Sequence, residues 1–469
     1  MPLAYQDLNI EIVDLQPDGR FRVRILGKAP NGREMRMDEG ESPFYKPEEL
    51  RPLIAKMDRR RASQAELTAL GEKLASLLLP GRVREIYTAS LDCVRMRGEG
   101  LRLRLRIEPL PMAALPWEYV LVRQTAEVVP GDFLCLQPDV SITRYENIGA
   151  PLEPILSKKE FRVVIVLANP VETTLEDLDV NADKAAILNA VQALNASADA
   201  SVIETVVVER ATRESLLRAI TDADIFHFAG HGVFEAANLG EDGTFEKKGR
   251  IVLEQTDGKE DRFDSDQLAI ELSHAGVRLA VLGACNSGSR DGTGAWSGVA
   301  PALVRGNVPA VVAMQFKVAD RNAAYFMSFL YAKVLAGSSI DQGVSEGRRR
   351  IFSGAATTSA DWAVNRDWGV PVLYLRTEDG VLFPAVSDKQ QTSPGQGASV
   401  VRVRQKVRTV SGEMLASHVE NVLAGNIDVN QEIDRIDKGA NVVGARFGTL
   451  GGYGPQRKKP DGKSGGGDK

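Results

Sequence analysis

The chain has 469 residues, a formal net charge of -5, 43% hydrophobic residues and three cysteines. The mildly acidic balance gives no indication of a nucleic-acid or membrane-surface partner, and no apolar run approaches the roughly 20 residues of a membrane-spanning helix. The N-terminus lacks a basic region followed by an apolar one, so we predict no signal peptide. Because the cysteine count is low and odd, it favours a reducing compartment, and we expect a cytoplasmic protein.

The first 150 residues combine strand and helix patterns. The runs at 10–15 and 20–26 alternate in polarity around the turn signal PDGR, which predicts two strands. Residues 64–79 carry apolar residues at helical spacing, and residues 101–110 alternate strictly. We therefore expect a helix followed by a strand with one apolar face.

From residue 161 onward, nearly continuous apolar runs rich in β-branched residues alternate with helical patterns at 182–196 and 322–336. Such runs are typical of parallel strands covered on both faces. The alternation predicts an α/β fold with a doubly wound, mostly parallel sheet and helices on both faces. In such sheets, ligands collect at the carboxyl ends of the strands. The six runs are 161–168, 201–208, 224–230, 277–284, 308–316 and 370–376.

A weak repeat follows the linker-like stretch DKQQTSPGQGAS. The pattern is an apolar residue, two others, an apolar residue and then glycine, starting at Val407, Val419, Ile433 and Phe447. This spacing predicts a β-rich C-terminal segment, either a small β-solenoid or stacked β-arcs. One irregular β-domain or an unordered tail is the alternative.

The segment DIFHFAGHGVFE (224–235) holds two of the four histidines. His227 lies inside an apolar strand, where a satisfied core histidine is the simplest interpretation. His231 follows that strand, at the edge where ligands bind. Gly230 and Gly232 permit unusual backbone angles and leave neighbouring N–H groups unshielded. His231 is therefore the candidate for chemistry, with a structural role in the loop as its alternative.

Cys285 ends the next strand run, LAVLGAC. A lone cysteine is usually a small buried hydrophobe, but a histidine stands in the same relation to the preceding strand. The spacing of 54 residues (285−231) is close to the separation of about 50 in caspase-like peptidases. A thiolate is the nucleophile, and His231 would exchange its proton. The backbone N–H groups of Gly232 and Cys285 are the candidate oxyanion hole.

Several motifs together resemble the CHAT family, caspase-like cysteine peptidases of the caspase–separase clan. They are LPWEYVL (115–121), AGHG (229–232), LGACNSG (282–288) and the strand–Asp–helix segment at 304–334. The resemblance covers about residues 65–378. It implies a thiol endopeptidase with a Cys285–His231 dyad and a thioester acyl-enzyme, no cofactor or metal, and a regulated role in bacterial defence or cell death.

The resemblance also suggests how a protein substrate is bound. In the related separases, an aspartate in a similar segment faces the basic residue before the cut, and Asp320 is the matching position. We take Asp320 and Gln315 as substrate-binding candidates, with capping of a helix that begins near Asn322 as the alternative role of Asp320. Phe316 stands where the family often has tryptophan, and the family's frequent TPR repeats are absent.

Other interpretations explain the sequence less well. An α/β-hydrolase nucleophile elbow would need a second glycine after Cys285 and a later histidine, and only His418 follows. The glycine-rich run SGSRDGTG lacks the lysine of a phosphate-binding loop. A catalytically silent caspase-fold scaffold or receptor stays open as the alternative, although Cys285 and His231 are both retained.

These patterns predict a chain of several segments, with a regulatory partner or self-assembly acting through the C-terminal repeat. The segments are a β-rich N-terminal segment (1–64), a non-catalytic half (65–150), a catalytic caspase-like domain (151–378), a linker (379–397), a β-repeat module (398–455) and a flexible tail (456–469).

Overall fold

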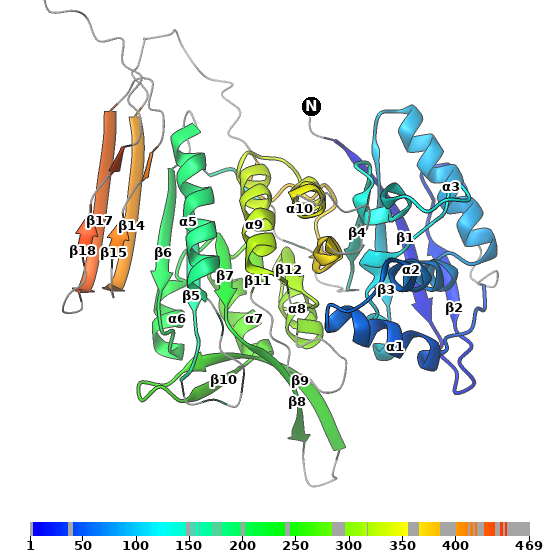
Figure 1. Ribbon diagram of the computed structural model, residues 1–469, viewed down its shortest axis with the longest axis horizontal. Helices are drawn as coiled ribbons and strands as arrows, with labels where there is room; N and C mark the ends of the chain where they lie inside the picture. The colour runs from blue at the N-terminus through cyan, green and yellow to red at the C-terminus, as the bar shows by residue number, and fades with distance from the viewer. Residues whose placement is uncertain are drawn as a thin grey trace, which may run out of the picture.

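A computed structural model provides the coordinates of the protein. Twelve described strands form one sheet in the order β17-β14-β6-β5-β7-β11-β12-β13-β4-β3-β1-β2 (Figure 1). The residues that the structure describes are 3–35, 41–146, 152, 155–158, 160–171, 173, 175, 178, 180–197, 202–239, 244–283, 296–316, 318–354, 365–384 and, as backbone only, 400–410, 413–415, 418–419, 426–436, 441–443 and 446–447.

The N-terminal part confirms the predicted strands and helix. The helix predicted over 64–79 is α2, and it begins at a capping box in which Ser63 and Glu66 each bond the other's backbone N–H, a strong helix-start signal. The elements of this part are β1 (Tyr5–Val13), β2 (Arg22–Leu26), α1 (Pro47–Asp58), α2 (Gln64–Leu78), α3 (Gly81–Met96), β3 (Gly100–Ile107), α4 (Leu110–Ala113), the 3-10 helices η2 (Trp117–Tyr119), η3 (Pro130–Asp132) and η4 (Leu134–Leu136), and β4 (Val140–Arg144).

All six apolar runs from residue 161 onward are strands, and both predicted helices form. The elements of this part are β5 (Glu160–Leu167), α5 (Val180–Ser197), β6 (Val202–Val208), α6 (Arg213–Ala219), β7 (Ile225–Ala229), β8 (Gly232–Leu239), β9 (Thr244–Glu254), β10 (Glu260–Asp264), α7 (Ser265–His274), β11 (Leu279–Gly283), α8 (Trp296–Arg305), β12 (Ala310–Met314), α9 (Asp320–Leu335), α10 (Ile340–Gly354), η6 (Asp367–Gly369) and β13 (Pro371–Leu375).

The sheet is doubly wound and mostly parallel, as the sequence predicts. β5 pairs in parallel with β6 on one side and β7 on the other, so the strand order reverses between β5 and β7. Ligands of open α/β sheets bind outside the carboxyl ends of the strands at such a switch point. β13 corrects one expectation, because it runs antiparallel to β12.

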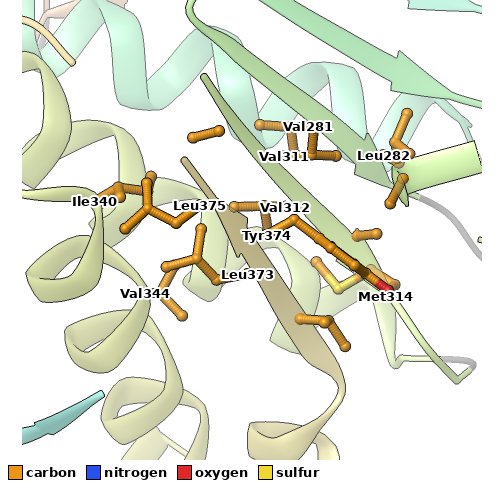
Figure 2. Packing of buried hydrophobic residues seen from close by; sticks show 14 of the residues in the cluster. Val281, Leu282, Val311, Val312, Met314, Ile340, Val344, Leu373, Tyr374 and Leu375 are labelled. Atoms are coloured by element: carbon orange, nitrogen blue, oxygen red, sulfur yellow. The ribbon is translucent and has the colours of Figure 1, made fainter. Parts of the chain in front are cut away.

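Helices cover both faces of the sheet. α5 joins β5 to β6, whereas α8 joins β11 to β12 in the opposite direction across the sheet, so right-handed crossovers place these helices on opposite faces. α9 packs beside α5 and α10, and α7 packs beside α8. Figure 2 shows Ile340 and Val344 of α10 next to Leu373 and Leu375 of β13, in the same apolar cluster as β11 and β12.

Buried charges join the N-terminal part to the rest. β4 meets β13 at a single residue pair, Tyr374↔Arg144. Arg102 of β3 donates to Asp341 of α10 from Nε (2.9 Å) and Nη2 (2.6 Å), and the Ser141 hydroxyl donates to the same carboxylate at 2.7 Å. Both charged side chains are fully buried. The expectation that β3 has only one dry face is therefore wrong, because the ion pair lets an arginine lie in the interior.

The β-rich C-terminal segment is confirmed as backbone. β14 (Val400–Val410) pairs in parallel with β17 (Asn426–Ile436), and β14 also joins β6. Two shorter parallel pairs accompany them, β15 (Glu413–Leu415) with β18 (Asn441–Val443) and β16 (His418–Val419) with β19 (Arg446–Phe447). The pairing offsets are 26, 28 and 28 residues, so each stacked coil contains two of the sequence repeats.

No helix within the described ranges is both long and apolar enough to cross a membrane.

Loss of charge at Asp341 should destabilise the protein. Asp341→Asn leaves the buried Arg102 guanidinium without its main partner, and we expect the free energy of unfolding to fall by about 3–5 kcal/mol, measured by denaturant titration. Asp18→Asn is the control, since the Arg20–Asp18 pair is exposed, and it should leave the unfolding midpoint unchanged. Equal midpoints for all three proteins would contradict a structural role for the buried pair.

Candidate active site

The candidate site lies where β7 and β11 end. These strands pair in parallel from Leu279↔Ile225 to Gly283↔Ala229, and every residue of both is buried. Their carboxyl ends therefore lie side by side, next to the switch point between β5 and β7. In Figure 1, β8, β9 and β10 lie at the same edge of the sheet.

His231 is placed at this edge by the turn that follows β7. The residue is only 1% exposed, and its carbonyl accepts a hydrogen bond from the Val252 N–H of β9 at 2.9 Å. Gly230 does not adopt a positive φ. A Cβ at Gly230 would lie 2.6 Å from the Phe228 ring and 2.7 Å from the Ala168 carbonyl oxygen. Close packing against the end of β5, rather than an unusual backbone angle, explains the glycine before His231.

The antiparallel sheet of β8, β9 and β10 begins directly after His231. β8 pairs with β9 from Gly232↔Ile251 outward. This hairpin packs closely against the start of α8, because a Cβ at Gly249 would lie 2.6 Å from the Gly298 carbonyl carbon and the Val299 nitrogen. The backbone after His231 is thus held against the helix that follows the Cys285 segment in sequence.

Cys285 lies outside the described residues, together with the rest of 284–295. Of the other two cysteines, Cys135 is buried, and burial raises the pKa of its thiol to about 11. A thiol with a raised pKa is a poor nucleophile, so Cys135 is a structural residue. Across the described part of the chain, no group of three or more His, Cys, Asp or Glu side chains is arranged to hold a metal ion.

His227 is a core histidine, as its position within an apolar strand predicts. Its Nδ1 lies 2.9 Å from the Tyr331 hydroxyl of α9, and the ring is fully buried. Burial lowers the pKa of His227 to about 3, because the apolar surroundings disfavour the charged ring. His227 therefore stays neutral at physiological pH and faces the layer of α9 instead of the strand ends.

Gln315 follows β12 at the same edge of the sheet, and its amide nitrogen is already engaged. Nε2 donates to the Glu118 carboxylate at 2.9 Å and to the Gly369 carbonyl at 2.7 Å. Glu118 is fully buried and forms a two-pronged ion pair with Arg144, at 3.1 and 2.8 Å. Sequence reasoning missed this role of Glu118, which lies in the LPWEYVL motif. Phe316 packs beside the Tyr119 ring of the same motif, with centroids 6.4 Å apart.

Asp320 is the first residue of α9, and Ala319 occupies the N-cap position. Asp367 binds the start of this helix, which sequence reasoning also missed. Asp367 Oδ2 accepts from the Ala319 N–H at 3.0 Å, from Asn322 Nδ2 at 2.8 Å and from Arg60 Nη2 at 3.1 Å. Since Asp367 comes from η6, far along the chain, no local pattern pointed to it.

The doubly wound, mostly parallel sheet with helices on both faces is that of a caspase-like α/β protein. A family model described as the CHAT domain matches residues 68–372. The chain belongs to the CHAT domain family, and membership indicates a function of the cysteine-peptidase type.

Comparison with solved structures gives matches to the separase–securin complex of Saccharomyces cerevisiae. Two crystal structures, at 3.0 and 2.6 Å resolution, match with TM-scores of 0.40 and 0.39 and sequence identities of 14% and 13%. The matches cover 80% and 79% of this chain and 30% of the matched chain in each case. A comparison with curated protein sequences finds no significant match.

Removal of the His227 imidazole should change how stability depends on pH. The ordinary histidine pKa is 6.5 and the folded-state pKa is about 3, so the unfolded chain binds the proton first as the pH falls. The group lowers the free energy of unfolding by about 1.4 kcal/mol per pH unit below pH 6.5. In His227→Gln, we expect this fall in the free energy of unfolding to be absent between pH 6 and pH 4. The measurement is a denaturant titration at each pH.

The control for loss of an imidazole is His274→Gln, because His274 is exposed at the end of α7. If the free energy of unfolding fell equally steeply with pH in the wild type and in His227→Gln, His227 would not stay neutral in the folded protein.

Proposed function

We propose that the protein is a cysteine endopeptidase that hydrolyses protein substrates through a Cys285–His231 dyad. The Cys285 thiolate attacks the scissile carbonyl carbon, and His231 delivers a proton to the leaving amine, which gives a thioester acyl-enzyme. Water then attacks the thioester with His231 as the base, so that the carboxylate product leaves and the thiol is regenerated.

The register of the sheet is the observation that carries the proposal. β7 and β11 pair with an offset of 54 residues (283−229), and the same offset separates Cys285 from His231 (285−231). In the sequence, each residue stands two positions beyond the last residue of its strand. We propose that the two side chains flank one scissile bond at this edge of the sheet.

The backbone after His231 supports Gly232 as one oxyanion donor. Because the His231 carbonyl accepts from the Val252 N–H, the alternation of an antiparallel ladder turns the Gly232 N–H away from β9. We propose that this N–H and that of Cys285 stabilise the tetrahedral oxyanion. Loss of one such donor typically slows the reaction about a hundredfold or more.

Substrate selection is proposed to depend on Asp320, with Gln315 on the wall of the site. Asp320 opens α9 at the carboxyl edge of the sheet, and a carboxylate there would favour Arg or Lys before the cut through a charge-assisted hydrogen bond. Glu118 and the Gly369 carbonyl hold the Gln315 amide nitrogen, and we propose that its side-chain carbonyl oxygen accepts a hydrogen bond from substrate.

The setting of the activity is also a proposal. The low, odd cysteine count supports a cytoplasmic location. The family supports a regulated role in bacterial defence or cell death, with residues 398–455 receiving a regulatory protein or a second copy. The competing candidate is a catalytically silent scaffold, which the retention of both Cys285 and His231 disfavours.

The dyad is tested with a panel of fluorogenic peptides and proteins. Cys285→Ala should abolish turnover and labelling by peptidyl electrophiles, and His231→Asn should lower kcat by about 10²–10⁴-fold. Matched controls are Cys93→Ala, a half-buried thiol in the N-terminal part, and His274→Asn, an exposed imidazole. Unchanged turnover in Cys285→Ala, or an inert and unlabelled wild type, would favour the scaffold.

Substrate preference is tested with Asp320→Asn. We expect the wild type to prefer Arg or Lys before the cut, and the variant to lose about ten- to a hundredfold of this preference in kcat/KM, with cleavage of neutral peptides retained. Asp222→Asn is the control, because Asp222 is exposed in the turn before β7, at the opposite edge of the sheet. A variant that keeps the full basic preference would leave Asp320 as a helix-start residue only.

A further inference from the structure

Among the described residues, a C-terminal strand forms one edge of the large sheet. β17 is the last strand in the order of the sheet, and no other strand among the described residues pairs with its outer edge. An unpaired strand edge is a template for another strand. This edge belongs to a stack of coils whose strands pair in parallel.

The two long strands of the stack carry opposite charge. β14 reads VVRVRQKVRTV, with four basic residues and no acidic one, whereas β17 reads NIDVNQEIDRI, with three acidic residues and one basic. The register places Arg402 opposite Asp428 and Lys406 opposite Glu432. Opposite charges at paired positions stabilise a sheet, and like charges destabilise it, so this register selects an acidic strand for a basic one.

The other edge of β14 is held over a short length. β14 pairs with β6 through three residues, from Gln405↔Thr205 to Val407↔Val207, but with β17 through ten residue pairs. The strand pairing of β14 with β6 is therefore much the shorter of the two, although β14 also contacts α5. Release of β14 from β6 would leave the two-coil stack intact.

We propose that the acidic edge of β17 binds β14 of a second copy of this chain, in parallel and in the register that β14 and β17 already share. In the second copy, β14 leaves β6 and continues the stack, so that coils of successive chains alternate as β14, β17, β14, β17. The contact is heterologous and does not close on itself, so it produces a head-to-tail assembly of growing length.

A symmetric dimer of β17 edges is disfavoured by charge. An antiparallel pair centred on Gln431 would place Asp428 opposite Asp434 of the other copy, which is a like-charge contact.

The test compares the wild-type register with a charge-swapped one in the full chain. Both proteins carry Cys285→Ala, so the outcome does not depend on the proposed peptidase activity. The swapped protein also carries Arg402→Asp, Lys406→Glu, Asp428→Arg and Glu432→Lys, which keeps β14 and β17 of one copy complementary. Mass is measured by sedimentation velocity against concentration, and mixing by energy transfer between fluorophores attached at the N-terminus.

Each protein should assemble with itself beyond a dimer as the concentration rises, and co-assembly in the mixture should be at least about tenfold weaker. Preferential mixing of the two proteins would instead indicate an antiparallel contact between β17 edges and overturn the proposal. Co-assembly as strong as self-assembly would also overturn the proposal, since the four charged positions would then not lie in the contact between copies. If the protein with the wild-type strand charges stays monomeric at high concentration, the proposal is overturned, whether or not the charge-swapped protein folds.

Discussion

The parallel pairing of β7 with β11 is the constraint on which the rest of the site depends. All residues of both strands are buried, so a slip of one residue would move the His227 ring to the opposite face of the sheet. The Tyr331 hydroxyl beside His227 depends on the face that His227 occupies, and the close packing of Gly230 against Ala168 fixes the end of β7 against the end of β5. The same register fixes which residues follow the two strands at the edge. The turn that carries His231 is thereby held at the carboxyl edge of the sheet by packing.

The N-terminal part supports that edge through charges that have no access to water. Glu118 links Arg144 to Gln315, and Arg102 links β3 to Asp341. Removal of one partner from a buried pair leaves an uncompensated charge, which is costly. Because one apolar cluster runs from Leu8 to Phe383, the two parts share a core. In the LPWEYVL motif, Glu118 thus holds Arg144 and Gln315 in place.

The sequence was sufficient where the pattern is local. Continuous apolar runs and helical spacing predicted six strands and two helices of residues 161–376, but not β8, β9 and β10. A strand position alone identified His227 as a core residue. It was insufficient where the partner is distant in sequence. Arg102 and Asp341 are 239 residues apart, and Glu118 and Gln315 are 197 apart, so neither contact leaves a periodic signal. The antiparallel direction of β13 is also set by the path of α9 and α10, which no property of the strand itself reveals.

The C-terminal repeat shows how a period in sequence differs from a period in space. The repeat starts are 12 to 14 residues apart, but Val407 pairs with Ile433 and Val419 stands opposite Phe447. A coil therefore contains two repeats, and a strand meets the strand two repeats later. Charge alternates at that longer period, basic in the first coil and acidic in the second, which no single repeat could encode. Since β14 also touches β6, and β6 pairs with the strand that borders the switch point, whatever holds β14 acts on the same sheet that carries His231.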